Sequence, residues 1–420
     1  MNKRFLSITI LGSAGGVAKS FLSILNKTIL DKKDPLHSFM SGCQIHLIDR
    51  TQKSETYYNR LFPNLADKVS LHEFDLQDIL KFSNHLKSTN TSIVIDLSWA
   101  DTIEMLECCD KLGVYYVNSA LESTLVDENE ELHKGFPLIE RIKHFESKKD
   151  NLSNTKAIIG SGMNPGVVQW MALELMKKDK AELPLACYVV EQDTSFYLEK
   201  SIPKENVVYT SWSPECFLDE AIMSYPMFMR QRIPLFLYNQ PYEFEFNVTL
   251  GEKKFDGCLM PHEEIYTLGK LYDMETGFIY KVNDHTTKLI RNNLSNVDDI
   301  WDFDMKVLDP YDAPLTGEDL VGVLLVYQTK ELYMYNVMSN EIIFNEFRTN
   351  ATYFQVACGI YAAACTLLLD QIPKGIYYVD ELLLNFSNKY GDYLKHYMKD
   401  FVVGENQKTD GLLLDRIKKI

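Results

Sequence analysis

Residues 7–22 read SITILGSAGGVAKSFL, and this stretch decides the fold. The β-branched run over 7–11 predicts a strand, the small residues after it predict a tight turn, and the apolar spacing from Phe21 to Leu25 predicts a helix. Backbone N–H groups at the start of such a helix, together with the positive end of its dipole, bind pyrophosphate. We therefore interpret the stretch as a phosphate-binding turn between a strand and a helix.

Two glycines and an alanine provide the space that a ligand and the sheet need at this turn. Gly12 and Gly15 allow a ligand to approach the backbone closely, and Ala18 is small enough for the helix to pack on the sheet. The spacing, Gly-x-x-Gly-x-x-Ala, is a variant of the dinucleotide-binding fingerprint, so an ordinary glycine-rich turn without a ligand remains the alternative. The predicted cofactor contacts in the turn are Gly12, Ser13, Gly15, Gly16 and Val17.

A second predicted strand, Gln44–Asp49, ends on an acidic residue. In a dinucleotide-binding unit an acid at this place accepts hydrogen bonds from the adenosine ribose, which favours NAD over NADP. Arg50 beside it would instead suit the 2′-phosphate of NADP, and a solvated strand end without a ligand is a third interpretation. The sequence thus favours NAD, with Asp49 as its ribose contact, and leaves the other two open.

Two further strands, Ser92–Leu97 and Val114–Asn118, alternate with helical segments. Strands that alternate with helices over the first 160 residues predict an α/β fold with a Rossmann-type, doubly wound parallel sheet. Asp96 and Ser98, at the end of the third strand, are predicted cofactor contacts.

The composition is that of a globular protein with room for two domains. The 420 residues are 46% hydrophobic and 24% charged. The net charge of −16, from 43 basic and 59 acidic residues, argues against a nucleic-acid partner and favours a cationic substrate. No uninterrupted apolar run is long enough to span a membrane, and a strand begins close to the N-terminus, so we expect a cytoplasmic protein without a membrane partner.

The eight cysteines predict buried, reduced thiols, since none forms a Cys-x-x-Cys pair and most lie within apolar runs. The histidines are separated along the chain and show no metal-ligand spacing, so the sequence predicts no metal site. Walker, Gly-x-Ser-x-Gly and His-Glu-x-x-His motifs are absent from the sequence.

The loop Asn118–Thr124 leaves the carboxyl end of the fourth strand, where ligands of open α/β sheets bind. Glu122 in this loop is therefore a candidate site residue, and a solvated glutamate is the alternative. A later stretch predicts Asn164 as the N-cap and Pro165 as the first residue of a helix that continues over Val167–Met176. Capping alone explains that stretch locally.

From Leu183 onward, alternating strand-like segments replace the strand–helix alternation. They predict an inserted α+β domain with a mixed or antiparallel sheet. The segments are Ala186–Glu191, Tyr242–Val248, Gly277–Val282, Val321–Gln328 and Leu332–Met338.

A helix rich in small residues, Asn350–Leu369, is apolar nearly all round and predicts a return of the chain to the first domain. The charged tail, Lys399–Ile420, predicts an exposed helix. We thus expect an NAD-binding domain over 1–182, a substrate domain over 183–345, and C-terminal helices over 346–420 that return to the first domain.

With these segments placed, the chain resembles the saccharopine-dehydrogenase-like superfamily, and within it the bacterial homospermidine synthases. The motifs that carry the resemblance occur in family order and cover nearly the whole chain. They are the glycine turn, Asn118–Glu122, Gly162-Met-Asn164-Pro-Gly166, Thr210-Ser-Trp212-Ser213, Pro261-His262-Glu-Glu264, Asn283-Asp-His285 and Asn350-Ala-Thr-x-x-Gln355-Val356.

The resemblance implies a transferase of polyamine biosynthesis that holds NAD as a recycled cofactor. The family oxidises putrescine to an imine, releases ammonia, adds a second amine and reduces the new imine. Such a site needs carboxylates and an aromatic face for the ammonium groups, and a proton shuttle at the reacting nitrogen. By position, the implied substrate contacts are Glu122, Trp212, Glu220, His262 and Glu264, and the implied catalytic residues are His285, Asn164 and Glu122, with Asn164 also contacting the cofactor.

The sequence departs from the family after the Trp-Ser motif. The chain continues from Glu220 as EAIMSYPMFM, whereas the family has a longer stretch with a further Trp-Gly-Thr-His-Glu segment. Part of the amine pocket therefore differs. The alternatives are a saccharopine-dehydrogenase-type or carboxy-polyamine oxidoreductase, or a non-catalytic NAD-binding relative, and a homodimer stays open.

Overall fold

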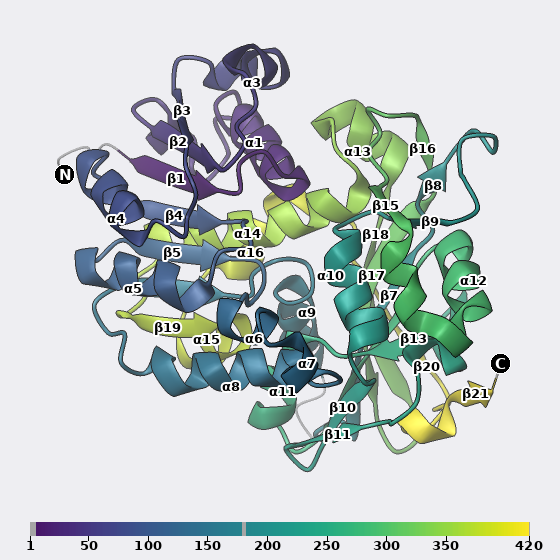
Figure 1. Cartoon of the computed structure of the whole chain (residues 1–420). Helices are drawn as coiled ribbons and strands as arrows, with labels where there is room; N and C mark the ends of the chain where they lie inside the picture. Colours follow the sequence, from purple (N-terminus) through teal and green to yellow (C-terminus); the bar gives the residue numbers. More distant parts are fainter. Residues whose placement is uncertain (1–5, 179–181, 420) are drawn as a thin grey trace. The chain divides into compact units, whose positions relative to one another are not determined.

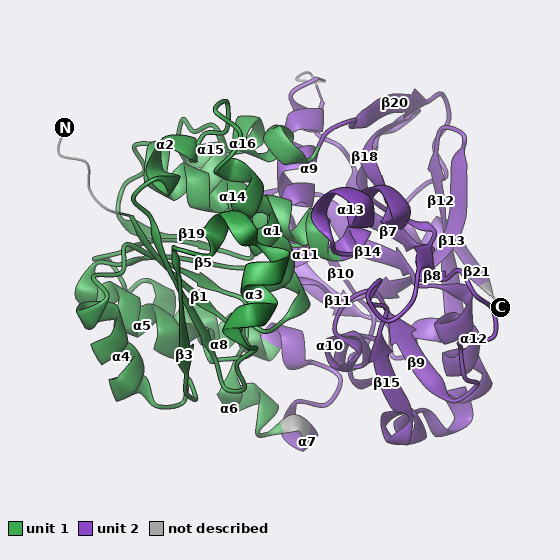
Figure 2. Ribbon diagram, turned by 90° about the horizontal axis from the view of Figure 1, so that it is seen from above, with its two compact units in different colours: residues 1–129, 140–166, 353–398 green, residues 130–139, 167–352, 399–420 purple. Residues whose placement is uncertain are grey.

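The computed structural model describes residues 6–178 and 182–419, and the chain divides into two compact units (Figure 2). Unit 1 comprises residues 1–129, 140–166 and 353–398, and unit 2 comprises residues 130–139, 167–352 and 399–420. Each unit is therefore assembled from three separate segments of the chain.

Unit 1 is built on a seven-stranded, fully parallel sheet in the order β3-β2-β1-β4-β5-β6-β19 (Figure 1). The direction of strand addition reverses between β1 and β4, which makes this the switch point of a doubly wound sheet. The strands are β1 (Ser7–Leu11), β2 (Gln44–Asp49), β3 (Val69–Glu73), β4 (Ile93–Asp96), β5 (Tyr115–Asn118), β6 (Lys156–Ile159) and β19 (Gly375–Tyr378). The predicted fold class is confirmed.

Helices cover both faces of this sheet, with α1, α3 and α14 on one side and α4, α5 and α8 on the other (Figure 2). All five residues of β1 are buried, as expected of a parallel strand covered on both faces. The helices are α1 (Gly16–Thr28), α2 (His37–Met40), α3 (Glu55–Leu61), α4 (Ile79–Ser88), α5 (Thr102–Leu112), α6 (Thr124–Asp127), α8 (Pro137–Lys149), α14 (Ala351–Leu369), α15 (Val379–Asn385) and α16 (Tyr390–Tyr397).

The small residues of α14 let it lie directly against other backbone. A Cβ atom on Gly359 would overlap the carbonyl oxygen of Gly162, and the hydroxyl of Ser161 donates to the carbonyl of Gly359 at 2.9 Å. By length and composition α14 would pass as a membrane span, but 78% of its apolar window is buried within the protein, which is typical of a core helix. The predicted packing of this helix against other backbone is therefore observed within unit 1.

Unit 2 contains a mixed sheet whose main path is β20-β18-β17-β7-β14-β13-β12-β21, with β10 and β11 attached beside β14. Only β7 and β14 pair in parallel along this path. Its strands are β7 (Ala186–Asp193), β10 (Met227–Arg230), β11 (Ile233–Phe236), β12 (Phe244–Leu250), β13 (Lys253–Met260), β14 (Glu275–Lys281), β17 (Glu318–Val326), β18 (Glu331–Ser339), β20 (Val402–Asn406) and β21 (Ile417–Lys419).

Two short sheets accompany the large one, β15 (Asp304–Val307) with β9 (Val207–Thr210) and β16 (Leu315–Thr316) with β8 (Phe196–Tyr197). All five strand segments predicted for this part of the chain are observed, with small shifts at their ends. The helices are α7 (Glu130–His133), α9 (Val167–Met176), α10 (Pro214–Leu218), α11 (Glu263–Leu271), α12 (Asp284–Asn292) and α13 (Asn340–Phe347).

The tail is not the exposed helix that its charge predicts. Residues 402–406 and 417–419 form β20 and β21, which pair with β18 and β12. The reason is a buried carboxylate: Glu331 accepts hydrogen bonds from Arg416, from the backbone N–H of Asp410 at 2.9 Å and from the hydroxyl of Thr409 at 3.1 Å. Satisfying this buried charge holds the tail on the sheet, and tertiary pairing overrides local composition.

The units also differ from the predicted domain boundaries. Helix α9 and residues 399–420 lie in unit 2, whereas the sequence analysis grouped them with the first domain and with its returning helices. All eight cysteines are free; seven are buried and Cys216 is partly exposed, which confirms the predicted reduced thiols.

Candidate functional site

The glycine turn of unit 1 has the geometry that a dinucleotide-binding turn requires. Gly12 has a φ of +67°, and a Cβ atom there would overlap the carbonyl of Leu97, so only glycine is accepted at this position. Gly15 is the N-cap of α1, without a side-chain cap and without an acidic residue in the first turn of the helix. The positive end of α1 is therefore not neutralised by its own side chains, as binding of a phosphate requires.

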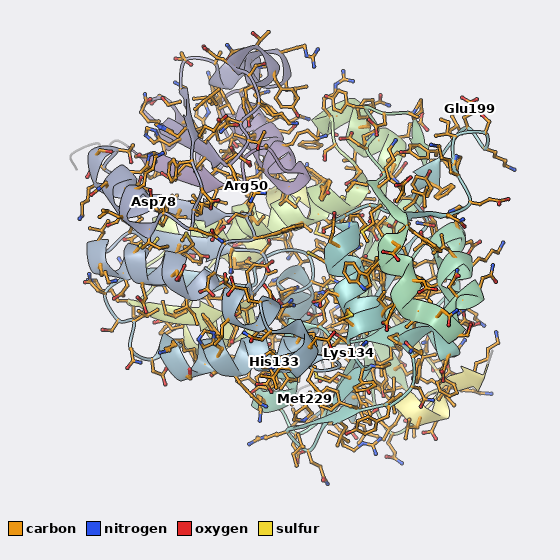
Figure 3. The ribbon with its side chains drawn as sticks, viewed as in Figure 1. Arg50, Asp78, His133, Lys134, Glu199 and Met229 are labelled. Carbon is orange, nitrogen blue, oxygen red and sulfur yellow. The ribbon has the colours of Figure 1, made fainter. Side chains whose placement is uncertain are left out.

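Asp49, at the end of β2, lies directly beside this turn. One of its carboxylate oxygens accepts the backbone N–H of Ala14 at 2.9 Å, and the other accepts the N–H of Thr51 at 3.1 Å. The neighbouring Arg50, labelled in Figure 3, is exposed. Asp49 is thus fixed at the edge of the turn, where a ribose contact is expected, and is not a freely solvated strand end.

The predicted contacts Asp96 and Ser98 lie on the other side of the switch point. An added Cβ on Gly12 would also come within 2.9 Å of the Cα atom of Ser98, so the two loops touch. Asp96 is 4% exposed and accepts hydrogen bonds from the Ser98 hydroxyl at 2.6 Å and from the Tyr116 hydroxyl at 2.7 Å. Burial raises the pKa of Asp96, and these hydrogen bonds oppose the rise.

A small pocket opens at the carboxyl ends of β4 and β5, where the fold positions ligands. It is lined by Asp96, Ser98, Ala100, Thr102, Asn118, Ser119, Ala120 and Glu122. The backbone N–H of Glu122 donates to the Thr102 hydroxyl at 3.0 Å, which fixes the loop, and its side chain is partly exposed. Glu122 therefore shares a pocket with two of the predicted cofactor contacts.

The loop that contains Asn164 lies beside this pocket. The N–H of Gly160 donates to the side-chain carbonyl of Asn118 at 2.9 Å, and the Cα position of Gly162 faces Ser119. The predicted helix is observed as α9, but the predicted cap is wrong: because α9 begins at Val167, Asn164 is not its N-cap and Pro165 is not its first residue. The loop instead closes on itself through a bridge between Gly162 and Gly166.

In unit 2 the two faces of the large sheet carry different groups of buried residues. One face carries an apolar core that includes Tyr188, Val190, Ile279, Leu320 and Leu324. On the other face Asp193 lies opposite Asp319, and Tyr280 lies opposite Glu191, all of them buried. Because alternate residues of a strand point to opposite faces, this row of acids lies on one side of the sheet.

Hydrogen bonds and burial have opposite effects on the pKa values of this row of acids. Asp193 accepts from the Ser211 hydroxyl at 2.6 Å, and Asp319 from the Thr352 hydroxyl at 2.5 Å. Burial, together with the neighbouring Glu191 and Asp193, raises the pKa of Asp319 well above its usual range. Burial and the same acids also raise the pKa of Tyr280.

A second acidic group surrounds His262. Its Nδ1 atom is hydrogen-bonded to the fully buried Glu264 and lies 3.6 Å from Glu263, and its Nε2 atom lies 3.7 Å from Glu220. Desolvation alone would lower the pKa of His262, but Glu264 and Glu220 together raise it well above its ordinary value. The carboxylates around the imidazole therefore favour its cationic form.

Glu220 and Glu264 each retain one buried oxygen, Oε2 and Oε1 respectively, that has no hydrogen-bond partner among the described residues. Burial raises the pKa of Glu220 well above its usual range, and His262 opposes this only in part. A buried carboxylate oxygen that lacks a partner is costly unless a donor reaches it. These two carboxylate oxygens can therefore each accept a hydrogen bond from a positively charged donor.

An aromatic wall adjoins this group. The His262 ring packs on Phe278 at 4.9 Å, Phe278 stacks on Tyr280 at 5.7 Å, and the indole N–H of Trp212 donates to the Tyr280 hydroxyl at 3.2 Å. Of the predicted substrate contacts in unit 2, the structure therefore brings Glu220, His262 and Glu264 together and connects Trp212 to them through two aromatic rings.

His285 belongs to a different aromatic group. Its Nε2 atom lies 3.1 Å from the carbonyl oxygen of Val207, and its ring packs against Phe196 and Tyr209. It lines a cavity of about 450 Å³ together with Asp193 and Lys281, among others. His285 and Asp193, a member of the row of acids, therefore line the same cavity. The proton-shuttle role of His285 stays a prediction.

Sequence reasoning missed the row formed by Glu191, Asp193 and Asp319. The signal was present: these acids occur in strands that are otherwise largely apolar and buried on both faces, such as ACYVVEQD in β7 and EDLVGVLLV in β17. An acid in such a position is buried, and a buried acid is a candidate site residue.

Among the described residues, His262, Glu263 and Glu264 place one potential ligand atom each within 4.8 Å of one another. The raised pKa of His262 disfavours metal binding here, because a metal is bound by the neutral imidazole.

No family model and no curated protein matches the sequence. Among solved structures, the chain is similar to saccharopine dehydrogenase (L-Glu forming) from Saccharomyces cerevisiae, with 10% identity and a TM-score of 0.57 over 96% of this chain and 99% of that chain. An oxidoreductase from Agrobacterium radiobacter, solved with NAD+, L-tartaric acid and magnesium, aligns at 7% identity with a TM-score of 0.37 over 94% of both chains. The chain thus has the fold of saccharopine dehydrogenase over almost its full length.

Proposed function

We propose that the protein is an NAD-dependent enzyme acting on a carbon–nitrogen bond of a small cationic amine, and that its reaction is the homospermidine synthase reaction. In that reaction an aminobutyl group passes between two putrescine molecules, by oxidation to an imine, loss of ammonia, amine addition and re-reduction. The observation that carries the proposal is the group formed by His262, Glu220 and Glu264, in which two buried carboxylate oxygens lack partners beside an aromatic wall.

The dinucleotide site is the turn at the switch point of unit 1. Gly12 and Gly15 leave room for a pyrophosphate, and Asp49 would accept hydrogen bonds from the ribose. Bound there, NAD supplies a hydride acceptor and later a hydride donor. The partly exposed Glu122, in the pocket beside Asp96, is the candidate to hold a polar group of the substrate or of the nicotinamide end.

The amine would bind through its charge. Putrescine carries two ammonium groups, and each needs a carboxylate or the face of an aromatic ring. Glu264 and Glu220 offer the carboxylate oxygens, and Trp212 with Tyr280 offers aromatic surface. The net charge of −16 favours the approach of such a cation. We place this activity in the cytoplasm, where free cysteines persist.

The fold likeness supports a second candidate, a saccharopine-dehydrogenase-type oxidoreductase. Such an enzyme would need cationic side chains for the carboxylates of an amino-acid substrate. The row of Glu191, Asp193 and Asp319 and the carboxylates around His262 favour a cation instead. A non-catalytic NAD-binding protein is the third candidate.

Incubation of the protein with NAD and putrescine, followed by mass spectrometry of the polyamines, separates the three. A synthase yields homospermidine and ammonia without net formation of NADH. A dehydrogenase accumulates NADH in proportion to its oxidised product. A protein that binds NAD but leaves putrescine unchanged contradicts the synthase. The same incubation with saccharopine then separates a saccharopine-type dehydrogenase, which forms NADH, from a non-catalytic protein.

A further inference from the structure

Three histidines that are far apart in the sequence meet in unit 1, away from the turn at the switch point. His46 lies on β2, His72 on β3 and His85 on α4. His46 pairs in register with Ser70 and Ile48 with His72, so both imidazoles point to the same face of the sheet, the face that α4 covers. The three side chains form what we call the histidine cluster.

The geometry of the histidine cluster is that of a metal site. Each histidine offers one ring nitrogen, and these nitrogens all lie within 4.8 Å of one another. The Nδ1 atom of His46 is 3.1 Å from the Nε2 atom of His72. Two imidazole nitrogens bound to one Zn²⁺ at about 2.0–2.1 Å in tetrahedral geometry lie about 3.4 Å apart, so this pair needs only a small adjustment.

The surroundings keep the imidazoles in the form that binds metals. Burial, and for His46 also the neighbouring His72, lowers the pKa of these two histidines. Burial and the other two rings lower the pKa of His85 to about 4. Burial thus favours the neutral form of each imidazole, which is the form that binds metals.

Threonine hydroxyls contact the cluster on one side, and two of its histidines are partly exposed. The Thr9 hydroxyl lies 3.5 Å from the Nε2 atom of His85 and 2.8 Å from the Thr91 hydroxyl, which is the kind of outer contact that orients a ligating imidazole. His46 and His72 are partly exposed, so an ion has access. An aromatic ring separates Lys81 from His85: the Lys81 ammonium lies 4.9 Å from the centre of the Phe74 ring, which packs on His85.

We propose that His46, His72 and His85 bind one divalent first-row transition-metal ion, such as Zn²⁺, with water completing the coordination. Three neutral imidazoles suit Zn²⁺, Co²⁺, Ni²⁺ or Cu²⁺ and not Mg²⁺ or Ca²⁺, which prefer oxygen ligands. The ion would connect β2, the edge strand β3 and the covering helix α4, and so stabilise the edge of the sheet. The alternative is a metal-free group of packed, neutral imidazoles.

The test uses the full-length protein, stripped of metal with a chelator, and titrated with Co²⁺ and then Zn²⁺. We expect one Co²⁺ per chain, seen by its visible absorption, and its displacement by Zn²⁺. His46→Gln and His72→Gln should each weaken Zn²⁺ binding more than tenfold. His133→Gln is the matched control and should bind Zn²⁺ as the original protein does, since His133 lies on α7 in unit 2, outside the histidine cluster.

A second measurement does not depend on whether the variants fold. In ¹⁵N spectra of the original protein, Zn²⁺ should shift the ring signals of His46, His72 and His85 and leave those of His262 and His285 in place. Absence of saturable binding of either ion, unchanged affinity in the His46→Gln and His72→Gln variants, or shifts confined to His262 would each overturn the proposal.

Discussion

Glu264 shows no exposed surface, yet one of its carboxylate oxygens has no hydrogen-bond partner among the described residues. If that oxygen receives an ammonium group of the substrate, Glu264→Gln should raise the apparent KM for putrescine about tenfold or more, equivalent to about 1.4 kcal/mol, and leave NAD affinity unchanged. Steady-state kinetics and NAD calorimetry measure the two effects.

The matched control is Glu215→Gln, because Glu215 is an exposed glutamate of α10. It should leave both constants unchanged. Amine turnover that survives the loss of Glu264, Glu220 and Glu122 one by one would remove the diamine from consideration.

Glu220 leads to a prediction about protons. Burial raises the pKa of the Glu220 carboxyl group well above its ordinary value, and an arriving ammonium group would lower it again by favouring the carboxylate. Diamine binding should therefore release a proton, and affinity should rise as the pH rises through the raised pKa of Glu220. Calorimetry in two buffers of different ionisation enthalpy measures the proton release.

Glu220→Gln supplies the control, since an amide has no proton to release. A proton count that is the same in this variant as in the original protein would assign the release to another group, such as the substrate amine itself.

At the level of the elements, the turn between β1 and α1 offers the sharpest test of the cofactor. Gly15 has a φ of −76°, a conformation that any residue adopts, and an added Cβ there would lie 3.2 Å from the carbonyl oxygen of Gly12. Gly15→Val should therefore leave unit 1 folded but fill the space of the pyrophosphate and abolish NAD binding. Calorimetry with NAD gives the affinity and circular dichroism gives the fold; unchanged affinity would remove the turn from the site.

The pairing of the tail with β18 and β12 depends on a buried ion pair. Arg416 is 3% exposed and Glu331 is fully buried, so Arg416→Leu would leave the Glu331 carboxylate without its cation. We expect a loss of about 3–5 kcal/mol in the free energy of unfolding, measured by urea denaturation.

Lys418→Met is the control for this variant, because the ion pair of Lys418 with Asp256 is solvent-exposed and contributes little to stability. Equal losses in the two variants would show that the buried pair does not hold the tail in place.

The elements also show which part of the fold is readable from the sequence. The strand–turn–helix at residues 7–22 and the alternating segments of unit 2 follow local patterns, and the structure has them within a few residues of the prediction. The tail and β19 are different. Their state depends on partners such as Glu331 and β6, which the local sequence does not contain.

For the molecule as a whole, the site residues that follow from local patterns were predicted, and those that depend on tertiary contacts were missed. Asp96, Ser98 and Glu122 were predictable because strand ends of a doubly wound sheet meet at one edge, and they do line one pocket. The histidine cluster was not, because only the register of β2 with β3 and the position of α4 bring its members together. The row of Glu191, Asp193 and Asp319 lies between these cases.

The division of each unit among separate segments has a consequence for how the chain is made. A ribosome delivers residues in order, and domains ordinarily fold as their sequence emerges. Here the parallel sheet of unit 1 is completed only by β19 at residues 375–378. The sheet of unit 2 is completed only by β20 and β21, within residues 402–419. Unit 1 therefore lacks its last strand until residue 378 has been made, and unit 2 until residue 419 has been made. Until then β6 and β12 present open edges, and an open strand edge is a site of aggregation.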